Sequence, residues 1–288
     1  MSIKLDNVSY TYMQGTPYQK TAIREITLEI QQREFVGVIG HTGSGKSTLI
    51  QHLNGLLQPT LGEVLVDGVN LHTKSAESKS ARRKVGMVFQ YPEQQLFEET
   101  VFDDIAFGPR NLKLDADTVE ARVRRAMDFV GLDFDAFSRR SPFRLSGGQM
   151  RRVAIAGVIA LEPTYLVLDE PSAGLDPRGR DEIFGQILNL YHTSNITVIL
   201  VSHNMEDIAR MANRLLVMHD GIISLDGRPE TIFGGSIDRL RAAGVDVPSV
   251  TTLLRKLKTA GLPVLGEALT PELATEEILA AMGGKYSA

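Results

Sequence analysis

The sequence predicts an α/β protein built around a parallel β-sheet. Three short runs are too uniformly apolar for strands with one face in water, so they indicate strands buried on both faces. These runs are residues 35–39, 165–169 and 197–202. Stretches with helical spacing alternate with them, at residues 46–55, 117–130, 147–161, 177–191 and 205–212. This alternation favours helices on both faces of the sheet.

Other segments predict a second sheet and a helical insertion. Runs at residues 4–10, 26–30 and 63–66, with a turn at Asp67-Gly68, are typical of short peripheral antiparallel strands. Further strands are expected at residues 85–89, 214–218 and 222–225. Residues 91–161 show helical periodicity and no convincing strand, and we expect them to form a helical insertion.

The pattern changes beyond about Gly234, where short helices are broken by Gly and Pro. Thr270 and Pro271 suit the N-cap and first position of a last helix, which Gly283-Gly284 would end. We therefore expect a main domain over residues 1–233 and a small helical extension over residues 234–288.

Composition restricts the possible functions. The chain has 31 Lys and Arg against 35 Asp and Glu, a net charge of −4, which argues against a protein that coats nucleic acid. It has no cysteine, which excludes disulfides, thiolate metal sites and thiol chemistry. The longest apolar stretch, residues 153–161, is far shorter than the ~20 residues that cross a bilayer. Residues 1–7 lack the apolar core of a secretion signal, so any membrane role is expected to involve a partner.

A phosphate-binding loop is predicted directly after the apolar run at residues 35–39. Residues 40–47, Gly-His-Thr-Gly-Ser-Gly-Lys-Ser, match G-x-x-x-x-G-K-[ST], and a helical pattern leaves the loop. Glycines let backbone amides surround a phosphate, and the helix start adds its positive dipole end. Lys46 would neutralise the β- and γ-phosphates, and the Ser47 hydroxyl would bind Mg²⁺. The plainer alternative is a glycine-rich turn beside an exposed lysine. The predicted nucleotide-binding residues here are Gly40, His41, Thr42, Gly43, Ser44, Gly45, Lys46, Ser47 and Thr48.

Two adjacent carboxylates end the apolar run at residues 165–169. A buried strand that ends in Asp169 and Glu170 is costly unless a positive group lies nearby. Successive side chains point in different directions, so Asp169 can face Mg²⁺ while Glu170 faces an attacking water as general base. This is the Walker B arrangement. Alternatively, the two acids cap the next helix.

A short signature sequence indicates which family of nucleotide-binding proteins the chain resembles. Residues 145–149, Leu-Ser-Gly-Gly-Gln, precede a helical pattern, and alone they could be a simple N-cap and turn. Gln90 and His203 each follow a predicted strand, and Ser-Ala-Gly-Leu-Asp at residues 172–176 follows Glu170-Pro171. In this order the motifs resemble the ATP-binding subunits of ABC transporters, over about residues 3–228.

The resemblance implies a role for each motif. It implies an ABC-type nucleotide-binding domain that hydrolyses ATP with Mg²⁺, in a head-to-tail dimer with two ATP molecules at the interface. Ser146, Gly147, Gly148 and Gln149 would bind the ATP of the other subunit, and Asp176 would signal across the dimer. Gln90 would contact Mg²⁺ or the lytic water and report to a membrane partner. His203 would contact the γ-phosphate, whereas the histidines at 41, 52, 72, 192 and 219 are expected to be structural.

Tyr12 matches the position at which an aromatic ring stacks on adenine in this family. Any flat ring can stack, so the position is weakly specific. The alternative is an aromatic side chain at the edge of a sheet.

Residues 91–101, Tyr-Pro-Glu-Gln-Gln-Leu-Phe-Glu-Glu-Thr-Val, point to one group of these ATPases. With residues 40–43 and 150–158 they resemble the ATPases of energy-coupling factor (ECF) importers for vitamins and metals, most closely the second ATPase of the pair. This implies a heterodimer, a transmembrane coupling protein, a membrane-embedded substrate-binding subunit and a location at the cytoplasmic face of the cell membrane. The C-terminal extension would support dimerisation.

Leu96 and Phe97 lie among polar residues and leave two interpretations open. They could line a groove for a helix of the transmembrane partner, or they could anchor a loop to the helical insertion. The alternative functions are an ATPase of another ABC transporter type, a soluble ABC ATPase acting on DNA or ribosomes, and an inactive regulatory cassette. The chain has one cassette, whereas ribosome-acting members carry two, and it has no sustained heptads of the kind that form the coiled coil of DNA-acting members. The intact Glu170 and His203 argue against an inactive cassette.

Overall fold

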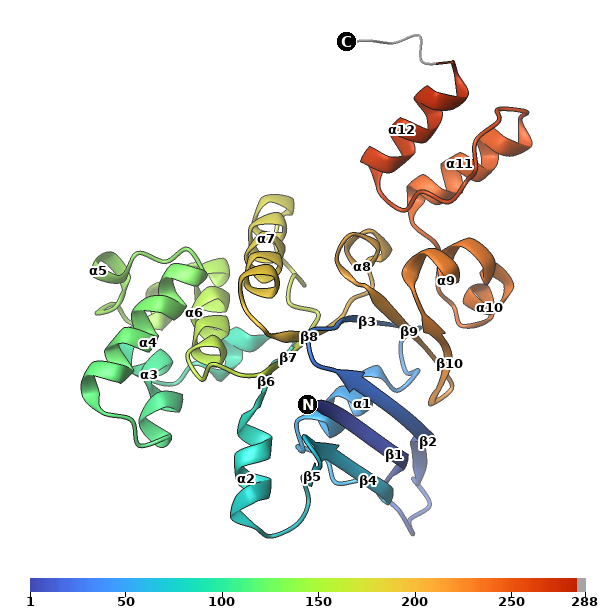
Figure 1. Cartoon of the computed structure of the whole chain (residues 1–288). Coiled ribbons are helices and arrows are strands. Elements are labelled where there is room, and N and C mark those ends of the chain that lie inside the picture. Colours follow the sequence, from blue (N-terminus) through green and yellow to red (C-terminus); the bar gives the residue numbers. More distant parts are fainter. Residues whose placement is uncertain (284–288) are drawn as a thin grey trace.

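A six-stranded sheet forms the centre of the computed structural model, which describes residues 1–283 (Figure 1). Its strands are β3 (Phe35–Ile39), β6 (Val85–Val88), β7 (Tyr165–Asp169), β8 (Thr197–Val201), β9 (Arg214–His219) and β10 (Ile222–Gly227). They lie in the order β10-β9-β3-β8-β7-β6, and only β10 pairs antiparallel with its neighbour. All residues of β3, β7 and β8 are buried, as their apolar sequences predicted. The parallel core sheet is therefore confirmed.

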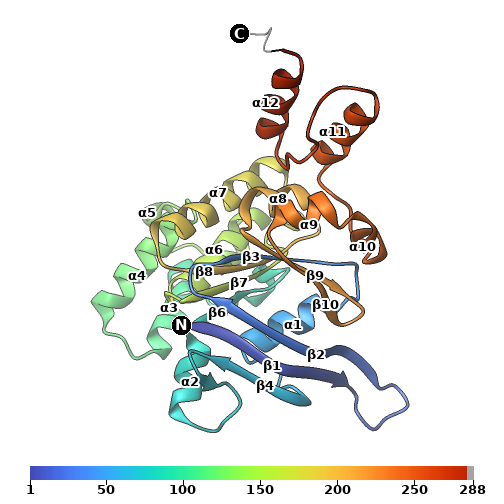
Figure 2. The ribbon, with the colours of Figure 1, turned by 45° about the vertical axis from the view of Figure 1, so that its right-hand side comes forward.

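A smaller antiparallel sheet lies beside this core (Figure 2). Its strands are β1 (Ser2–Tyr12), β2 (Lys20–Gln31), β4 (Leu61–Val66) and β5 (Val69–Asn70), in the order β2-β1-β4-β5. Asp67 and Gly68 both have positive φ, 51° and 79°, which is the backbone of a tight hairpin turn. The predicted peripheral antiparallel sheet is confirmed.

The core sheet separates two apolar clusters because successive side chains of a strand point to opposite faces. Phe35 and Ile39 of β3 face a cluster that includes the helical insertion. Val36 and Val38 face the other cluster, which includes the antiparallel sheet and helix α1 (Lys46–Leu53). The loop between β3 and α1 is thus held by a strand that is packed on both sides.

The helical insertion lies between β6 and β7 and contains no strand, as expected. It consists of η1 (Pro92–Gln95), α3 (Val101–Asn111), α4 (Ala116–Phe129), α5 (Phe134–Phe137), η2 (Pro142–Arg144) and α6 (Gly147–Ile159). The Thr100 and Asp115 side chains cap α3 and α4 by accepting hydrogen bonds from backbone amides. The other helices of the main domain are α2 (Ala76–Arg83), α7 (Pro177–Thr193) and α8 (Met205–Met211), of which α2 was not predicted.

The C-terminal part contains α9 (Pro229–Gly235), α10 (Ile237–Ala242), α11 (Ser249–Thr259) and α12 (Pro271–Ala281). The expected boundary between residues 233 and 234 falls inside α9, because Phe233 and Leu240 pack in the main core. Only α11 and α12 have an apolar cluster of their own, and both project from the rest of the chain (Figures 1 and 2). Within residues 1–283 no helix is long and apolar enough to cross a membrane.

The last helix begins as its sequence predicted. The Thr270 hydroxyl caps α12 by accepting a hydrogen bond from the Leu273 amide at 3.4 Å, and Pro271 is the first helical residue. Gly283 follows the helix with a φ of 80°. Gly284, the second residue of the predicted end signal, lies outside the described residues.

Candidate nucleotide site

The predicted phosphate loop connects β3 to α1, where its glycines are needed for close packing. Gly40 has a φ of 153°, and a Cβ added there would lie 2.4 Å from the Met218 carbonyl oxygen. Gly45 has a φ of 105°, and its Cβ would lie 2.7 Å from the Ala22 carbonyl oxygen. Neither position has room for a side chain, so this close packing of the loop requires glycine at both.

Lys46 begins α1 with its side chain buried beneath the loop. Its Nζ donates hydrogen bonds to the carbonyl oxygens of Gly40 at 2.8 Å and His41 at 3.0 Å. Burial lowers the pKa of Lys46, and the nearby charges of Glu170 and Asp169 partly offset this shift. A buried ammonium at the start of a helix is suited to binding an anion.

A pocket of about 480 Å³ opens beside this loop. It collects predicted residues from five separate parts of the chain: Tyr12, the loop and α1, Gln90, Asp169-Glu170 and His203. The predicted residues that line it are Tyr12, Thr42, Gly43, Gly45, Lys46, Ser47, Thr48, Gln90, Asp169, Glu170 and His203. Lys20, Ala22 and Val201 also line it and were not predicted. Gly40, His41 and Ser44 belong to the loop but do not line the pocket.

The two carboxylates lie at the end of β7, at the edge of the sheet where ligands bind in such folds. Burial raises the pKa of Asp169, and the Ser47 hydroxyl and Lys46 ammonium oppose this shift. Burial and then the Asp169 charge raise the pKa of Glu170 to about 7. A base with a pKa near 7 is well matched to accepting a proton at neutral pH.

The geometry around Glu170 is unusual in two respects. Its φ is 52°, a backbone conformation that glutamate rarely adopts. Its Oε1 is buried without a hydrogen-bond partner among the described residues, and His203 Nε2 lies 3.2 Å away without hydrogen-bond geometry. Strained and unsatisfied groups of this kind are typical of functional sites.

Tyr12 lies at the rim of the pocket, at the end of β1. Its hydroxyl is 3.2 Å from Thr48 Oγ1, and its ring meets Tyr10 edge to face with 4.8 Å between the centroids. The side chain is partly exposed beside the pocket. These contacts fit an adenine platform and also a sheet-edge aromatic, so its role stays a prediction.

The signature residues lie outside the pocket. Ser146 caps α6, its Oγ accepting from the Gln149 amide at 3.3 Å, while Gln149 Oε1 accepts from the Ser146 amide at 3.0 Å. A Cβ added at Gly147 would meet no atom within 4 Å. Asp176 caps α7 by accepting from the Gly179 amide at 2.9 Å. Ser146 to Gln149 therefore form an open helix N-terminus that does not take part in the chain's own pocket.

Arg151 is a residue of the site for which sequence reasoning assigned no role. It is 3% exposed and joins three motifs. Nη2 donates to the Gln90 carbonyl oxygen at 3.0 Å, Nε donates to Glu93 Oε2 at 3.2 Å, and Nη1 donates to the Ala173 carbonyl oxygen. The signal in the sequence was an arginine two positions after the signature, in a helix that is otherwise mostly apolar from Val153 onward.

Leu96 and Phe97 have different environments, so neither interpretation of the pair holds for both. Leu96 is buried in the main core and is an anchor of the loop. Phe97 is 57% exposed and meets Phe107, 46% exposed, edge to face with 4.9 Å between the centroids. The expectation that Leu96 lines a docking groove is therefore wrong, because its side chain faces inward.

A strand, a glycine loop and a helix around a pocket with paired carboxylates define a P-loop nucleotide-binding domain. The family model for ABC transporters matches residues 23–173, more than half of the chain. The energy-coupling factor transporter ATP-binding protein EcfA2 from Clostridium tetani is 53% identical, over 99% of each chain. The protein of that name from Clostridioides difficile is 50% identical, over 99% of each chain.

Solved structures agree with these relatives. The cbiO1 protein from Clostridium perfringens, part of the ABC transporter complex cbiONQ, is 35% identical with a TM-score of 0.71 and covers 83% of this chain and 94% of its own. A dimeric ATP-binding cassette in a post-hydrolysis state with ADP and Pi is 30% identical with a TM-score of 0.70, covering 78% of this chain and 98% of its own. The chain belongs to the ABC transporter family, among its energy-coupling factor ATP-binding proteins. The resemblance to the second ATPase of the pair is confirmed.

Proposed function

We propose that this chain is the ATP-hydrolysing subunit of an ECF-type importer and that the pocket beside Lys46 binds MgATP. One pocket brings together the buried Lys46 ammonium, the buried Asp169 carboxylate, the half-buried Glu170 carboxylate and the His203 imidazole, and this grouping supports the proposal. Without a ligand, such a grouping is costly, because Glu170 Oε1 has no hydrogen-bond partner within residues 1–283. A nucleotide phosphate and an attacking water would satisfy these groups.

The residues fit a magnesium ion at this position. The Ser47 hydroxyl, the Asp169 carboxylate and the Gln90 amide line the pocket together and offer the hard oxygen ligands that Mg²⁺ prefers. Burial disfavours the charge on Asp169, which a cation would stabilise. When bound, the ion would neutralise charge on the β- and γ-phosphates.

The remaining groups divide the work of hydrolysis. Lys46 and the amides of the loop bind and orient the phosphates. Glu170 accepts the proton of the attacking water, and His203, 3.2 Å from Glu170 Oε1, holds the γ-phosphate on the same side of the pocket. Tyr12 stacks on the adenine at the rim.

Substitution of the base tests this function. Glu170→Gln keeps the size of the side chain but cannot accept the proton, so ATP binding should persist while hydrolysis by the assembled transporter falls about 100-fold or more. Glu29→Gln, at an exposed position of β2 away from the pocket, is the matched control. Binding is measured by titration calorimetry and hydrolysis by phosphate release. Hydrolysis near the wild-type rate in Glu170→Gln would exclude Glu170 as the base.

We further propose a set of partners for this function. An ABC ATPase of this group works with a second ATPase, here in a head-to-tail heterodimer that α11 and α12 help to hold. A transmembrane coupling protein and a membrane-embedded substrate-binding subunit complete the importer, with this chain at the cytoplasmic face of the cell membrane. The cargo is a vitamin or a metal ion. The solved relative that is part of the cbiONQ complex supports assembly with other subunits.

A further inference from the structure

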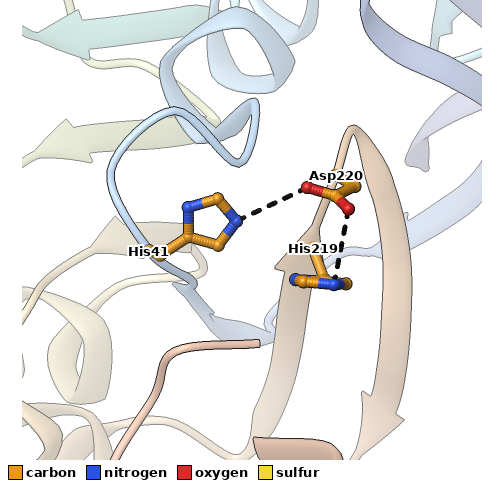
Figure 3. Close-up of side chains that lie close together, drawn as sticks. All are labelled: His41, His219 and Asp220. Carbon is orange, nitrogen blue, oxygen red and sulfur yellow. Dashed lines mark ion pairs between the residues drawn. The ribbon is translucent and has the colours of Figure 1, made fainter. Parts of the chain in front are cut away.

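Two imidazoles and one carboxylate lie close together where the phosphate loop meets the end of β9: His41 comes from the loop, His219 ends β9, and Asp220 lies in the turn between β9 and β10 (Figure 3). The turn is fixed to the loop, because the Gly221 amide donates to the Ser44 carbonyl oxygen at 3.0 Å. Arg24 Nη2 donates to the Asp220 carbonyl oxygen at 2.8 Å. Asp220 has a φ of 46°, and its carboxylate directs one oxygen toward His41 and the other toward His219 (Figure 3).

The distances suit a metal ion. His41 Nε2 lies 3.8 Å from Asp220 Oδ1, and His219 Nε2 lies 3.5 Å from Asp220 Oδ2. One ligand atom from each residue falls within 4.8 Å of the other two. Bond lengths of about 2.0–2.2 Å to zinc in a tetrahedron separate its ligand atoms by about 3.3–3.5 Å. Small rotations of the partly exposed side chains would bring even the two ligand atoms that lie farthest apart to that separation.

The hydrogen bond of the His41 ring leaves its Nε2 free to bind a metal ion. Its Nδ1 lies 2.8 Å from the Thr42 carbonyl oxygen, so Nδ1 carries the proton and donates. Nε2 then presents its lone pair toward Asp220 (Figure 3). A histidine that donates its other ring N–H to a backbone carbonyl is the usual arrangement of a metal-binding histidine.

The surroundings hold the two rings in place. The His41 and His219 rings meet edge to face with 5.5 Å between their centroids. A Cβ added at Gly244, after α10, would lie 3.1 Å from the His41 Cβ, so the backbone of the C-terminal part packs closely against His41. His219 Nδ1 is buried with no hydrogen-bond partner in the described part of the chain, which leaves Nε2 as its accessible nitrogen.

We propose that His41, His219 and Asp220 bind a divalent transition metal, with Zn²⁺ the best match and water as the remaining ligand. Two imidazoles and a carboxylate suit zinc, whereas Mg²⁺ prefers oxygen ligands alone. The site is distinct from the proposed magnesium position at Ser47 and Asp169. It ties the phosphate loop to the β9–β10 turn, so by linkage any effect of the metal on ATP affinity equals the effect of ATP on metal affinity.

Titration of the chelator-treated full chain with Zn²⁺ tests the site. We expect one Zn²⁺ per chain with a Kd on the order of 10 μM or tighter, and a higher melting temperature with Zn²⁺. His219→Gln and Asp220→Asn should each weaken binding by about tenfold or more. Asparagine tolerates the positive φ of Asp220, so this second variant keeps the turn. His192→Gln, an exposed histidine on α7, should bind Zn²⁺ like the wild type.

Two further measurements decide the result. X-ray absorption at the zinc edge should show two imidazole nitrogens, and excess Mg²⁺ should not displace the zinc. A shell of oxygen atoms only, binding in the millimolar range, or equal affinity in the wild type and in folded Asp220→Asn would overturn the proposal. In those cases the three side chains form only ion pairs.

Discussion

Asp67 connects the two sheets through a single carboxylate. Its Oδ1 accepts a hydrogen bond from the Tyr165 hydroxyl at 2.7 Å, and its Oδ2 lies 2.6 Å from Lys84 Nζ. Burial alone would raise the pKa of Asp67, but these hydrogen bonds outweigh it and hold the pKa below its usual value. The ionised carboxylate therefore stabilises the fold above about pH 4, and this contribution is lost as the pH falls through the folded-state pKa.

Asp67→Asn should lower the free energy of unfolding by about 1–3 kcal/mol at neutral pH. Asparagine accepts the φ of 51° at this turn, so the change reports on the hydrogen bonds and not on the backbone. The difference from wild type should shrink at about pH 3, where the wild-type carboxyl is more often protonated. Urea unfolding at both pH values measures it, with exposed Asp6→Asn as control. An equal decrease in the free energy of unfolding at both pH values would contradict an ionic contribution of Asp67.

At the scale of elements, Arg151 positions three segments from one helix. It links α6 to the Gln90 backbone, to η1 through Glu93 and to the segment after β7 through Ala173. These segments carry the pocket's glutamine, the loop that leads to Phe97 and the turn before Asp176. A rigid connection between them would transmit a change in the pocket to the surface.

Arg151→Met should leave ATP binding to the isolated chain close to wild type while reducing hydrolysis by the assembled transporter about tenfold or more. The physical reason is that Gln90 and its segment lose their fixed position, although no phosphate contact is removed. Arg151→Lys should be intermediate, because one ammonium cannot make all three contacts. Arg178→Leu, an exposed arginine on α7, is the control. Loss of ATP binding in Arg151→Met would show a role within the pocket itself.

Phe97, between η1 and α3, and Phe107 of α3 form an exposed aromatic pair, where we expect the transmembrane protein to dock. Phe97→Asp should leave the melting temperature near wild type and weaken capture of the coupling protein about thirtyfold, the effect of ~2 kcal/mol at an interface. Leu96→Asp should instead lower the melting temperature, because it places a charge in the core. Pull-down from detergent-solubilised membranes measures capture. Full capture by Phe97→Asp would place the docking surface elsewhere.

At the scale of the whole molecule, the open N-terminus of α6 implies a second subunit. Gly147→Asp should spare the fold and ATP binding in the chain's own pocket, because a Cβ there meets no atom within 4 Å. It should block hydrolysis in the dimer, since a carboxylate would repel the partner's phosphates. Calorimetry on the isolated chain and phosphate release by the complex test this. Lost binding in the isolated chain with preserved activity in the complex would refute a head-to-tail dimer.

The sequence by itself determined the elements whose signal is local. The β3–loop–α1 unit needs only an apolar strand, glycines at tight positions and a helix start, and all three are adjacent in the chain. The strands β7 and β8 were predicted for the same reason, because burial on both faces requires apolar residues throughout. Helix α2 was missed because its eight residues include only two apolar residues, Ala76 and Ala81, although Ser75 is a suitable N-cap.

Only the tertiary structure decided which side chains face inward and which meet. Leu96 and Phe97 are neighbours of similar polarity, yet the packing of the helical insertion buries one and exposes the other. Arg151 contacts Gln90 and Ala173, and Asp220 lies beside His41, through pairs of residues far apart in the sequence. Such contacts depend on how the helical insertion and the β9–β10 turn pack against the core sheet, and no local pattern of residues records that packing.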